Sequence, residues 1–197
     1  VIAINPNFPA KDYKGFIEEL KKNPDKYAYA SSGQGGIGHL QTELFKSLAR
    51  VSMVHIPYNG ASPAQLSVLS GQTDMIFDNL ASAAPQIRAG RLKGFAVTTL
   101  KPSSFFPELP TVSDTGLAGF DISTWFGIFA PAGTPKSVVD RLHAEFERAL
   151  GSDDLRQRLS RMGAEPAPMT PADFGAFVLA EQKKYAGIVK ASGARVD

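Results

Sequence analysis

The chain has 197 residues, 43% of them hydrophobic and 20% charged, which is the composition of a globular protein with one domain or two small ones. A net charge of +2 is too small to indicate nucleic acid or an acidic membrane as the partner, and the lack of cysteine excludes a disulfide framework, a thiolate metal site and a thiol catalyst. No apolar run approaches the length of a membrane span, and nothing at the amino end resembles a signal peptide.

The first predicted elements are a short strand over residues 1–5 and an amphipathic helix over residues 13–23. Apolar residues fall on one face of this helix and Lys and Glu on the other; the apolar ones are Phe16, Ile17 and Leu20. Because the chain begins at Val1 rather than at a methionine, directly in a strand, we interpret it as a mature or excised segment.

A glycine-rich elbow follows. Residues 27–30 are aromatic and alternating, which predicts a strand, and apolar spacing predicts a helix over residues 39–49. Residues 31–38 between them contain four glycines, so the backbone can turn sharply and bring free N–H groups together at the helix start. With the helix dipole and the hydroxyls of Ser31 and Ser32, this elbow is a candidate site for a carboxylate or phosphate.

The pattern of strand, elbow and helix then repeats. Further strands are predicted over residues 51–58, 75–77 and 92–98, and further helices over residues 62–69 and 80–89. This alternation predicts right-handed crossovers and a parallel sheet. In such a sheet every strand-to-helix elbow lies at the carboxyl edge, where ligands bind. We therefore expect three elbows to face one crevice: residues 31–38, 58–62 and 78–82.

After Thr99 the chain changes character. Prolines punctuate a loop, a long strand is predicted over residues 120–130, and only helices follow. Apolar stripes predict these helices over about 138–150, 155–162 and 173–189, the last after a capping box at Thr170 to Asp173. We place a boundary between Asp121 and Phe126, with an α/β unit before it and a helical unit after it.

Five motifs occur together in the order found in one transporter family. They are YAYASSGQGGIGHLQTELF, VHIPYNGASPAQLSVLSGQTDMIFDN, RLKGFAVTT, LPTVSDTGLAGF and WFGIFAPAGTP. Almost end to end, the chain resembles the substrate-binding proteins of tripartite tricarboxylate transporters, the Bug or TctC family. The resemblance implies an α/β fold of the periplasmic-binding-protein type II, with a parallel-sheet lobe and a mostly helical carboxyl-terminal remnant of another lobe.

The function implied by the resemblance is capture of a small carboxylate in the periplasm. The ligand would be a di- or tricarboxylate, an amino acid or an aromatic acid, and the protein would present it to the membrane permease of the transporter. Such a protein is not an enzyme, does not itself span the membrane, and needs neither a cofactor nor a nucleic acid partner.

The resemblance also implies a division of the chain. Family members carry a further amino-terminal part that includes a signal peptide and most of the first lobe. Residues 1–121 would then form the second lobe. Residues 122–197 would be a crossover strand and a helical segment that return to the first lobe.

The family's binding site maps onto the three elbows. Ser32 and the N–H groups of Gly36 to Gly38 would bind one carboxylate, and Tyr58 would wall the ligand and donate its hydroxyl. An ionised Asp78 cannot donate, so we expect it to hold its loop or to contact a hydroxyl or ammonium group of the ligand. The candidate ligand-binding residues are Ser31, Ser32, Gly33, Gly36, Ile37, Gly38, Tyr58, Asn59, Asp78 and Asn79.

Each of these residues also has a purely structural interpretation. Glycine-rich elbows are common as plain turns in α/β proteins, and a lone tyrosine such as Tyr58 more often packs than binds. Asp78 and Asn79 are simple turn and capping residues, and Trp125 is interpreted as hinge or core.

The alternative function is a dinucleotide-binding oxidoreductase domain, because Gly33 to Gly38 matches G-x-G-x-x-G. Such a site needs an acidic residue about twenty positions on, at the end of the next strand, but that strand ends at Pro57-Tyr58-Asn59. A third interpretation is an interaction module with exposed apolar helices that carry Phe146, Phe174 and Phe177. No metal site is expected, because no acidic residue lies at ligand spacing from the scattered histidines, His39, His55 and His143.

Overall fold

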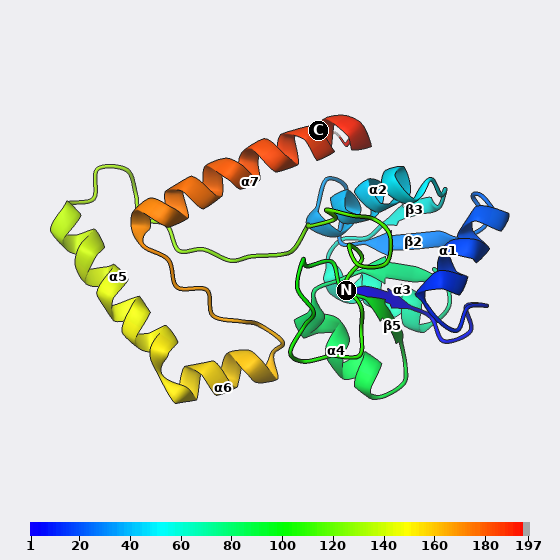
Figure 1. Ribbon diagram of the computed structural model, residues 1–197, viewed down its shortest axis with the longest axis horizontal. Helices are drawn as coiled ribbons and strands as arrows, with labels where there is room; N and C mark the ends of the chain where they lie inside the picture. The colour runs from blue at the N-terminus through cyan, green and yellow to red at the C-terminus, as the bar shows by residue number, and fades with distance from the viewer. Residues whose placement is uncertain (195–197) are drawn as a thin grey trace. The chain divides into compact units, whose positions relative to one another are not determined.

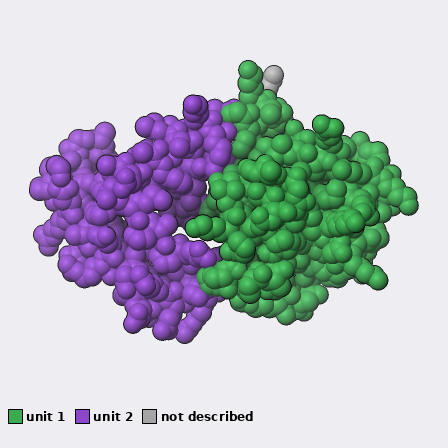
Figure 2. Space-filling view, in the orientation of Figure 1, with its two compact units in different colours: residues 1–124, 187–197 green, residues 125–186 purple. Residues whose placement is uncertain are grey.

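The computed structural model describes residues 1–194 and divides into two compact units (Figures 1 and 2). Unit 1 comprises Val1–Thr124 together with the end of the chain from Gly187, and unit 2 comprises Trp125–Ala186. The last three residues of the predicted second segment, 195–197, lie outside the described residues.

Unit 1 contains a five-stranded sheet with the strand order β3-β2-β4-β1-β5. The strands are β1 (Ile2–Ile4), β2 (Ala28–Ser31), β3 (Val54–Pro57), β4 (Met75–Phe77) and β5 (Lys93–Ala96). Strand β2 pairs in parallel with β3 and β4, whereas β1 pairs antiparallel with both β4 and β5.

The expected α/β fold is therefore confirmed, but the prediction of a purely parallel sheet is wrong for β1. No direct crossover connects β1 to either neighbour in the sheet, since its neighbours come much later in the chain. The alternation of strands and helices constrains direction only where a strand and its neighbour are joined by one crossover. The direction of β1 is therefore decided by tertiary contacts and not by the local sequence pattern.

Helices α1 (Tyr13–Lys22) and α2 (Ile37–Ala49) pack on one face of the sheet. Aromatic rings fill the space between them: the Phe16 and Phe45 ring centroids are 5.9 Å apart, and Phe45 lies 5.2 Å from Phe77 on β4. Phe16 also meets Phe95 on β5 at 5.7 Å. This aromatic cluster joins both helices to the strands, so it anchors α2 and the elbow that precedes it.

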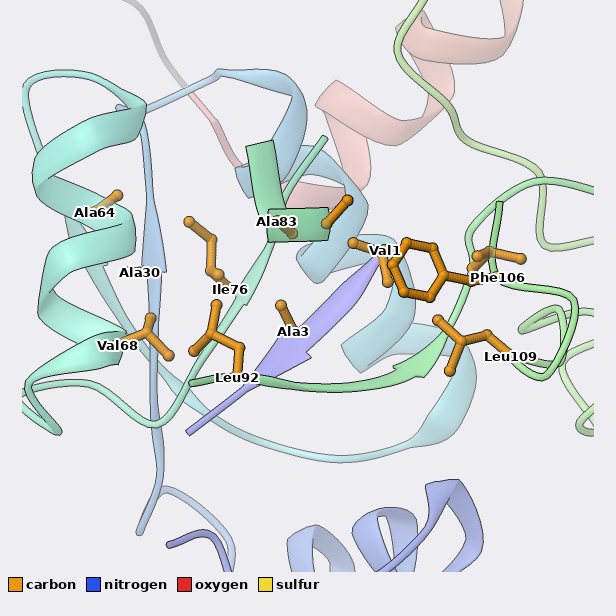
Figure 3. Close-up of a cluster of buried hydrophobic side chains, with 12 residues drawn as sticks. Val1, Ala3, Ala30, Ala64, Val68, Ile76, Ala83, Leu92, Phe106 and Leu109 are labelled. Atoms are coloured by element: carbon orange, nitrogen blue, oxygen red, sulfur yellow. The ribbon is translucent and has the colours of Figure 1, made fainter. Parts of the chain in front are cut away.

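Helices α3 (Ala61–Leu69) and α4 (Leu80–Arg88) pack on the opposite face (Figure 3). Alternate strand residues point here because side chains along a strand alternate between the faces. Alanines let the helices approach the sheet closely: Ala64 from α3, Ala83 from α4, and Ala3 and Ala30 from the strands. Val68 and Ile76 fill the space between them.

Unit 2 consists of α5 (Lys136–Gly151), α6 (Asp153–Arg161) and most of α7 (Pro171–Ser192). The predicted cap of α7 is present, because the Asp173 N–H donates to Thr170 Oγ1 at 3.1 Å and that hydroxyl donates to Asp173 Oδ2 at 2.7 Å. Trp125 packs against Phe177 with ring centroids 5.1 Å apart and donates to Glu181 Oε2 at 3.1 Å.

The strand predicted over residues 120–130 is absent. An isolated extended segment needs a neighbouring strand for its backbone hydrogen bonds, and none of the described strands pairs with this segment. Among residues 1–194, no helix combines the length and the apolar character that crossing a membrane requires.

Candidate functional site

Three strand-to-helix elbows meet at one edge of the sheet. Strands β2, β3 and β4 run in parallel, so their carboxyl ends lie at the same edge. The Tyr58 N–H donates to the Ser31 carbonyl at 2.9 Å and the Gly60 N–H to the Ser32 carbonyl at 3.1 Å, which ties the first elbow to the second. The third elbow is joined to α3 by Gln65, whose Nε2 donates to Asp78 Oδ2 at 3.0 Å.

All three helices that begin at this edge start without a side-chain cap. Their N-cap residues are Gly36, Gly60 and Asn79, and none accepts a capping hydrogen bond with its side chain. By contrast, α1 begins at the other edge and is capped by Asp12, which accepts from the Gly15 N–H at 2.8 Å. Uncapped N-termini leave N–H donors and the positive ends of three helix dipoles at one place.

The donors of the first elbow differ by one position from the expected set. The Gly36 N–H donates to the Gly33 carbonyl at 3.2 Å, so it is occupied. The first backbone bond of α2 runs from the Leu40 N–H to the Gly36 carbonyl at 3.0 Å. Because the first turn of a helix has no internal acceptors, the free N–H groups are those of residues 37–39 rather than 36–38.

The two serines of this elbow have different environments. Ser31 is buried, and its Oγ lies 2.6 Å from His55 Nε2 and donates to the Gly33 carbonyl at 3.1 Å. Its hydroxyl is therefore used in hydrogen bonds within the protein, whereas we expected both serine hydroxyls to donate to an anion. Ser32 is exposed at the edge, beside Gly36.

Two glycines explain why this loop can form. Gly35 has a φ of +72°, in the left-handed region that glycine adopts at no steric cost. At Gly38, a Cβ atom would lie 2.7 Å from the Phe77 carbonyl oxygen of β4, so only glycine lets α2 approach the strand this closely. The elbow is thus shaped by close packing as well as by turn geometry.

The other two elbows hold the remaining candidates. Tyr58 is half-buried against the core cluster below α3, and Asn59 is exposed. Asp78 is buried, its Oδ1 accepts from the Asn79 N–H at 2.7 Å, and its Oδ2 accepts from Gln65. Both carboxylate oxygens are used inside the protein, which is the loop-holding arrangement considered for Asp78.

Sequence reasoning missed three residues at this edge: Gln65, His39 and His55. Gln65 also donates to Ser82 Oγ at 3.0 Å, and its only sequence signal is a long polar side chain within an otherwise small and apolar helix. His39 and His55 were regarded as scattered, yet their rings stack with centroids 4.1 Å apart. The strand register sets His55 beside Tyr29, which no motif reveals.

Burial dominates the electrostatics beneath the first elbow. It lowers the pKa of His39, and it lowers the pKa of His55 to about 4, with the neighbouring His39 adding to the effect. Burial also raises the pKa of Tyr29, whose hydroxyl donates to Glu43 Oε1 at 2.6 Å. For Glu43 burial acts to raise the pKa, but hydrogen bonds from Lys46 and Tyr29 outweigh it and leave the pKa lowered.

Two further features of unit 1 lie away from this chemistry. An open hollow of about 1150 Å³ is lined by α1, the start of β5 and the loop around Leu109, at the edge opposite the elbows. Its walls do not include the uncapped helix starts. Within residues 1–194, no three His, Cys, Asp or Glu side chains are grouped so that they could hold a metal ion.

Residues 1–194 match a family model described as the tripartite tricarboxylate transporter family receptor. Protein BugT of Bordetella pertussis is 30% identical over 196 residues, which cover 100% of this chain and 60% of BugT. The chain thus spans less than two thirds of the length of this relative.

Two solved structures share the fold and carry ligands. Rpa4515 of R. palustris with adipate is 31% identical, with a TM-score of 0.90 over 98% of this chain and 65% of that one. MatC from Rhodopseudomonas palustris with bound malate is 29% identical, with a TM-score of 0.79 over 98% of this chain and 65% of that one.

Proposed function

Because the chain belongs to the tripartite tricarboxylate transporter receptor family, we propose that it binds a small dicarboxylate and presents it to the membrane permease of such a transporter. The observation that carries the proposal is the convergence of three uncapped helix starts at the edge where Ser32 is exposed. Free N–H groups at positive helix ends bind anions. The adipate and malate named for two related structures support the ligand class.

Each candidate residue then has a role in this proposal. The N–H groups of residues 37–39 and the Ser32 hydroxyl bind one carboxylate. Tyr58 and Asn59 line the site from the second elbow, and Asn79 lines it from the third. Residues whose polar groups are already satisfied support the loops instead: Ser31, Gly33, Gly36 and Asp78.

The domain assignment belongs to the same proposal. Residues 1–121 form one lobe of a two-lobed binding protein, and residues 122–197 return to the other lobe. Unit 2 supports this assignment because α5 and α6 bury no residue. Apolar side chains are exposed on α5, at Phe146, and in the segment before it, at Phe126, Ile128 and Phe129. Such a surface is typical of an interface with a further part of the protein.

We expect the 197-residue chain alone to bind adipate or malate more weakly than micromolar. The Ser32 hydroxyl and the three N–H groups contribute about 6–12 kcal/mol, at about 1.5–3 kcal/mol for each charge-assisted hydrogen bond. Association and ordering cost about 4–15 kcal/mol, and a micromolar Kd requires about 8 kcal/mol net. Isothermal titration calorimetry measures this directly. A micromolar or tighter Kd would contradict the assignment of residues 1–121 as one of two lobes that share the binding site, and would leave carboxylate binding intact.

Replacing Ser32 with Ala is expected to weaken carboxylate binding roughly ten- to hundredfold, because it removes one hydrogen bond to a charged group. The measurement is an NMR titration of the wild-type and S32A chains with adipate and with malate, since this method follows weak binding. Ser32 is exposed, so the variant is expected to fold as the wild type does.

Ser47→Ala is the matched control, because Ser47 is also exposed but lies on α2 away from the elbows. Equal affinities for the wild type and S32A would remove Ser32 from the site. Binding of NAD but of neither dicarboxylate would support the oxidoreductase alternative instead.

In this proposal the protein binds its ligand without catalysis and works in the periplasm. Its net charge of +2 gives no reason to expect nucleic acid as a partner.

A further inference from the structure

A stack of three rings lies directly beneath the glycine-rich elbow. The His39 and His55 rings are nearly parallel, with an interplanar angle of 6° and centroids 4.1 Å apart. On its strand side, His55 stacks on Tyr29 at 4.7 Å with an interplanar angle of 13°. The stack joins the first turn of α2 to strands β3 and β2, so it spans both ends of the elbow.

Each histidine is hydrogen-bonded to the elbow itself. The Gly35 N–H donates to His39 Nδ1 at 3.0 Å, which requires a lone pair on that nitrogen. His55 Nε2 lies 2.6 Å from Ser31 Oγ, and the Ser31 hydroxyl proton is directed to the Gly33 carbonyl at 3.1 Å. With that proton used, His55 Nε2 is the donor to Ser31 Oγ, which a neutral and a charged imidazole ring both allow. Only the bond from Gly35 requires a deprotonated nitrogen, and that nitrogen is His39 Nδ1.

We propose that His39 and His55 are positioning residues that hold residues 31–38 in the binding conformation only while His39 Nδ1 is unprotonated, so that acidification dismantles this half of the site. The link to the ligand rests on the proposed carboxylate binding. The contact between histidine and elbow stands independently of it.

Protonation would oppose this arrangement in two ways. A proton on His39 Nδ1 would face the Gly35 N–H, and two donors cannot share a hydrogen bond. Two imidazolium rings 4.1 Å apart would also repel each other in a partly buried place. The loop would have to move for a proton on His39 Nδ1 to be accommodated.

Burial is the largest cause of the lowered histidine pKa values; of the charged side chains that face the pair, Lys46 adds to this effect and Glu43 opposes it. Glu43 and Lys46 lie on α2 and Tyr29 on β2. The Lys46 ammonium lies 2.7 Å from Glu43 Oε1, and the Tyr29 hydroxyl donates to the same oxygen, so Glu43 has partners of its own. Burial lowers the pKa of both histidines below the ordinary value of about 6.5, which leaves both rings neutral at neutral pH.

The direction of the pH effect follows from these lowered pKa values. The unfolded chain takes up protons on both histidines as the pH falls through about 6.5, while the folded protein does not until the pH approaches the folded values, about 4 for His55. The contribution of the pair to stability is therefore complete above about pH 6.5 and is lost as the pH falls toward 4.

The test is ¹H–¹⁵N NMR of the 197-residue chain without ligand between about pH 7.5 and about pH 4. The Gly35 amide is expected to shift with the same midpoint as the His39 ring protons, below 6.5. His39→Asn retains an acceptor oxygen near the Nδ1 position but has no titrating group, so the Gly35 shift is expected to lose its pH dependence. His39→Phe retains the stacking but not the acceptor, and is expected to displace the Gly35 amide at every pH.

His143→Asn is the matched control, because His143 lies on α5 in unit 2, where its Nε2 is 2.9 Å from the Met169 carbonyl oxygen. The Gly35 titration should be unchanged in this variant. A Gly35 amide that stays fixed while the His39 ring titrates would overturn the proposal. So would a Gly35 titration that persists unchanged in His39→Asn.

A second experiment measures the affinity for adipate at the two ends of the pH range. The protonation of adipate itself weakens binding equally in all variants, so the comparison is between the wild type and His39→Asn. The wild type is expected to lose roughly tenfold more affinity on acidification, the equivalent of one hydrogen bond. Equal losses would overturn the link to the site. No adipate binding at pH 7.5 would instead contradict the proposed function, and the ligand-free amide test would still decide the histidine proposal.

Discussion

Replacing Phe45 with Ala is expected to destabilise unit 1 by about 3–5 kcal/mol, the cost typical of removing a fully buried aromatic side chain. Phe45 has no exposed surface, and its ring meets four others: Phe16 at 5.9 Å, Phe77 at 5.2 Å, and Tyr13 and Phe120 each at 6.5 Å. The cavity left behind would separate α2 from the sheet. Since α2 carries the anion donors, carboxylate binding would be lost together with stability.

Urea unfolding followed by far-UV circular dichroism measures this effect. Leu66→Ala is the matched control within unit 1, because Leu66 on α3 is 64% exposed and its truncation leaves no cavity. We expect the control to change the free energy of unfolding by less than about 1 kcal/mol. A loss for F45A no larger than that of L66A would mean that the aromatic cluster is not the core of this unit.

Replacing Gly38 with Ala is expected to destabilise unit 1 by about 1–3 kcal/mol, the usual cost of overpacking a tight contact. The added Cβ would lie 2.7 Å from the Phe77 carbonyl oxygen, and a backbone atom of a central strand cannot easily move away. The first turn of α2 must shift instead, and it carries the N–H groups of residues 37–39. Carboxylate binding should therefore weaken more than the stability loss alone explains.

Gly187→Ala isolates the effect of the methyl group. Gly187 also lies in a helix, α7, but a Cβ there would meet no atom within 4 Å. Alanine is favoured over glycine in helices by up to about 1 kcal/mol, so this variant should be as stable as the wild type or more so. Denaturant unfolding and adipate titration are compared for both variants. A G38A protein with wild-type stability and affinity would show that α2 can relax without cost.

Local signals predicted most elements of unit 1 to within a few residues. Helix α1 was predicted over 13–23 and ends at Lys22, because its apolar stripe is strong. The start of α3 also differs from the prediction by one residue. The sequence predicts a start at Ser62, but α3 begins at Ala61 after Gly60, whose φ is +112°. A glycine in a left-handed conformation gives no side-chain signal of where the helix begins.

The candidate site shows the same division between local and distant causes. The glycine elbow, the turn at Asn59 and the turn at Asp78 can be predicted from the sequence, because Gly, Asn and Asp are the residues that turns favour. The sequence does not show which of the two serine hydroxyls is free to bind a ligand. Ser31 and Ser32 are adjacent and chemically identical, and only the alternation of the strand turns Ser31 inward to His55.

By itself, the sequence determined the alternating strands and helices, the three elbows and the family, since each depends on residues that are close together in the chain. Only the tertiary structure decided the antiparallel direction of β1, the close approach of Gly38 to β4 and the pairing of His39 with His55. These features depend on contacts between segments that are distant in the chain. Local propensity and motif spacing do not encode such contacts, because they arise only when the sheet brings the segments together.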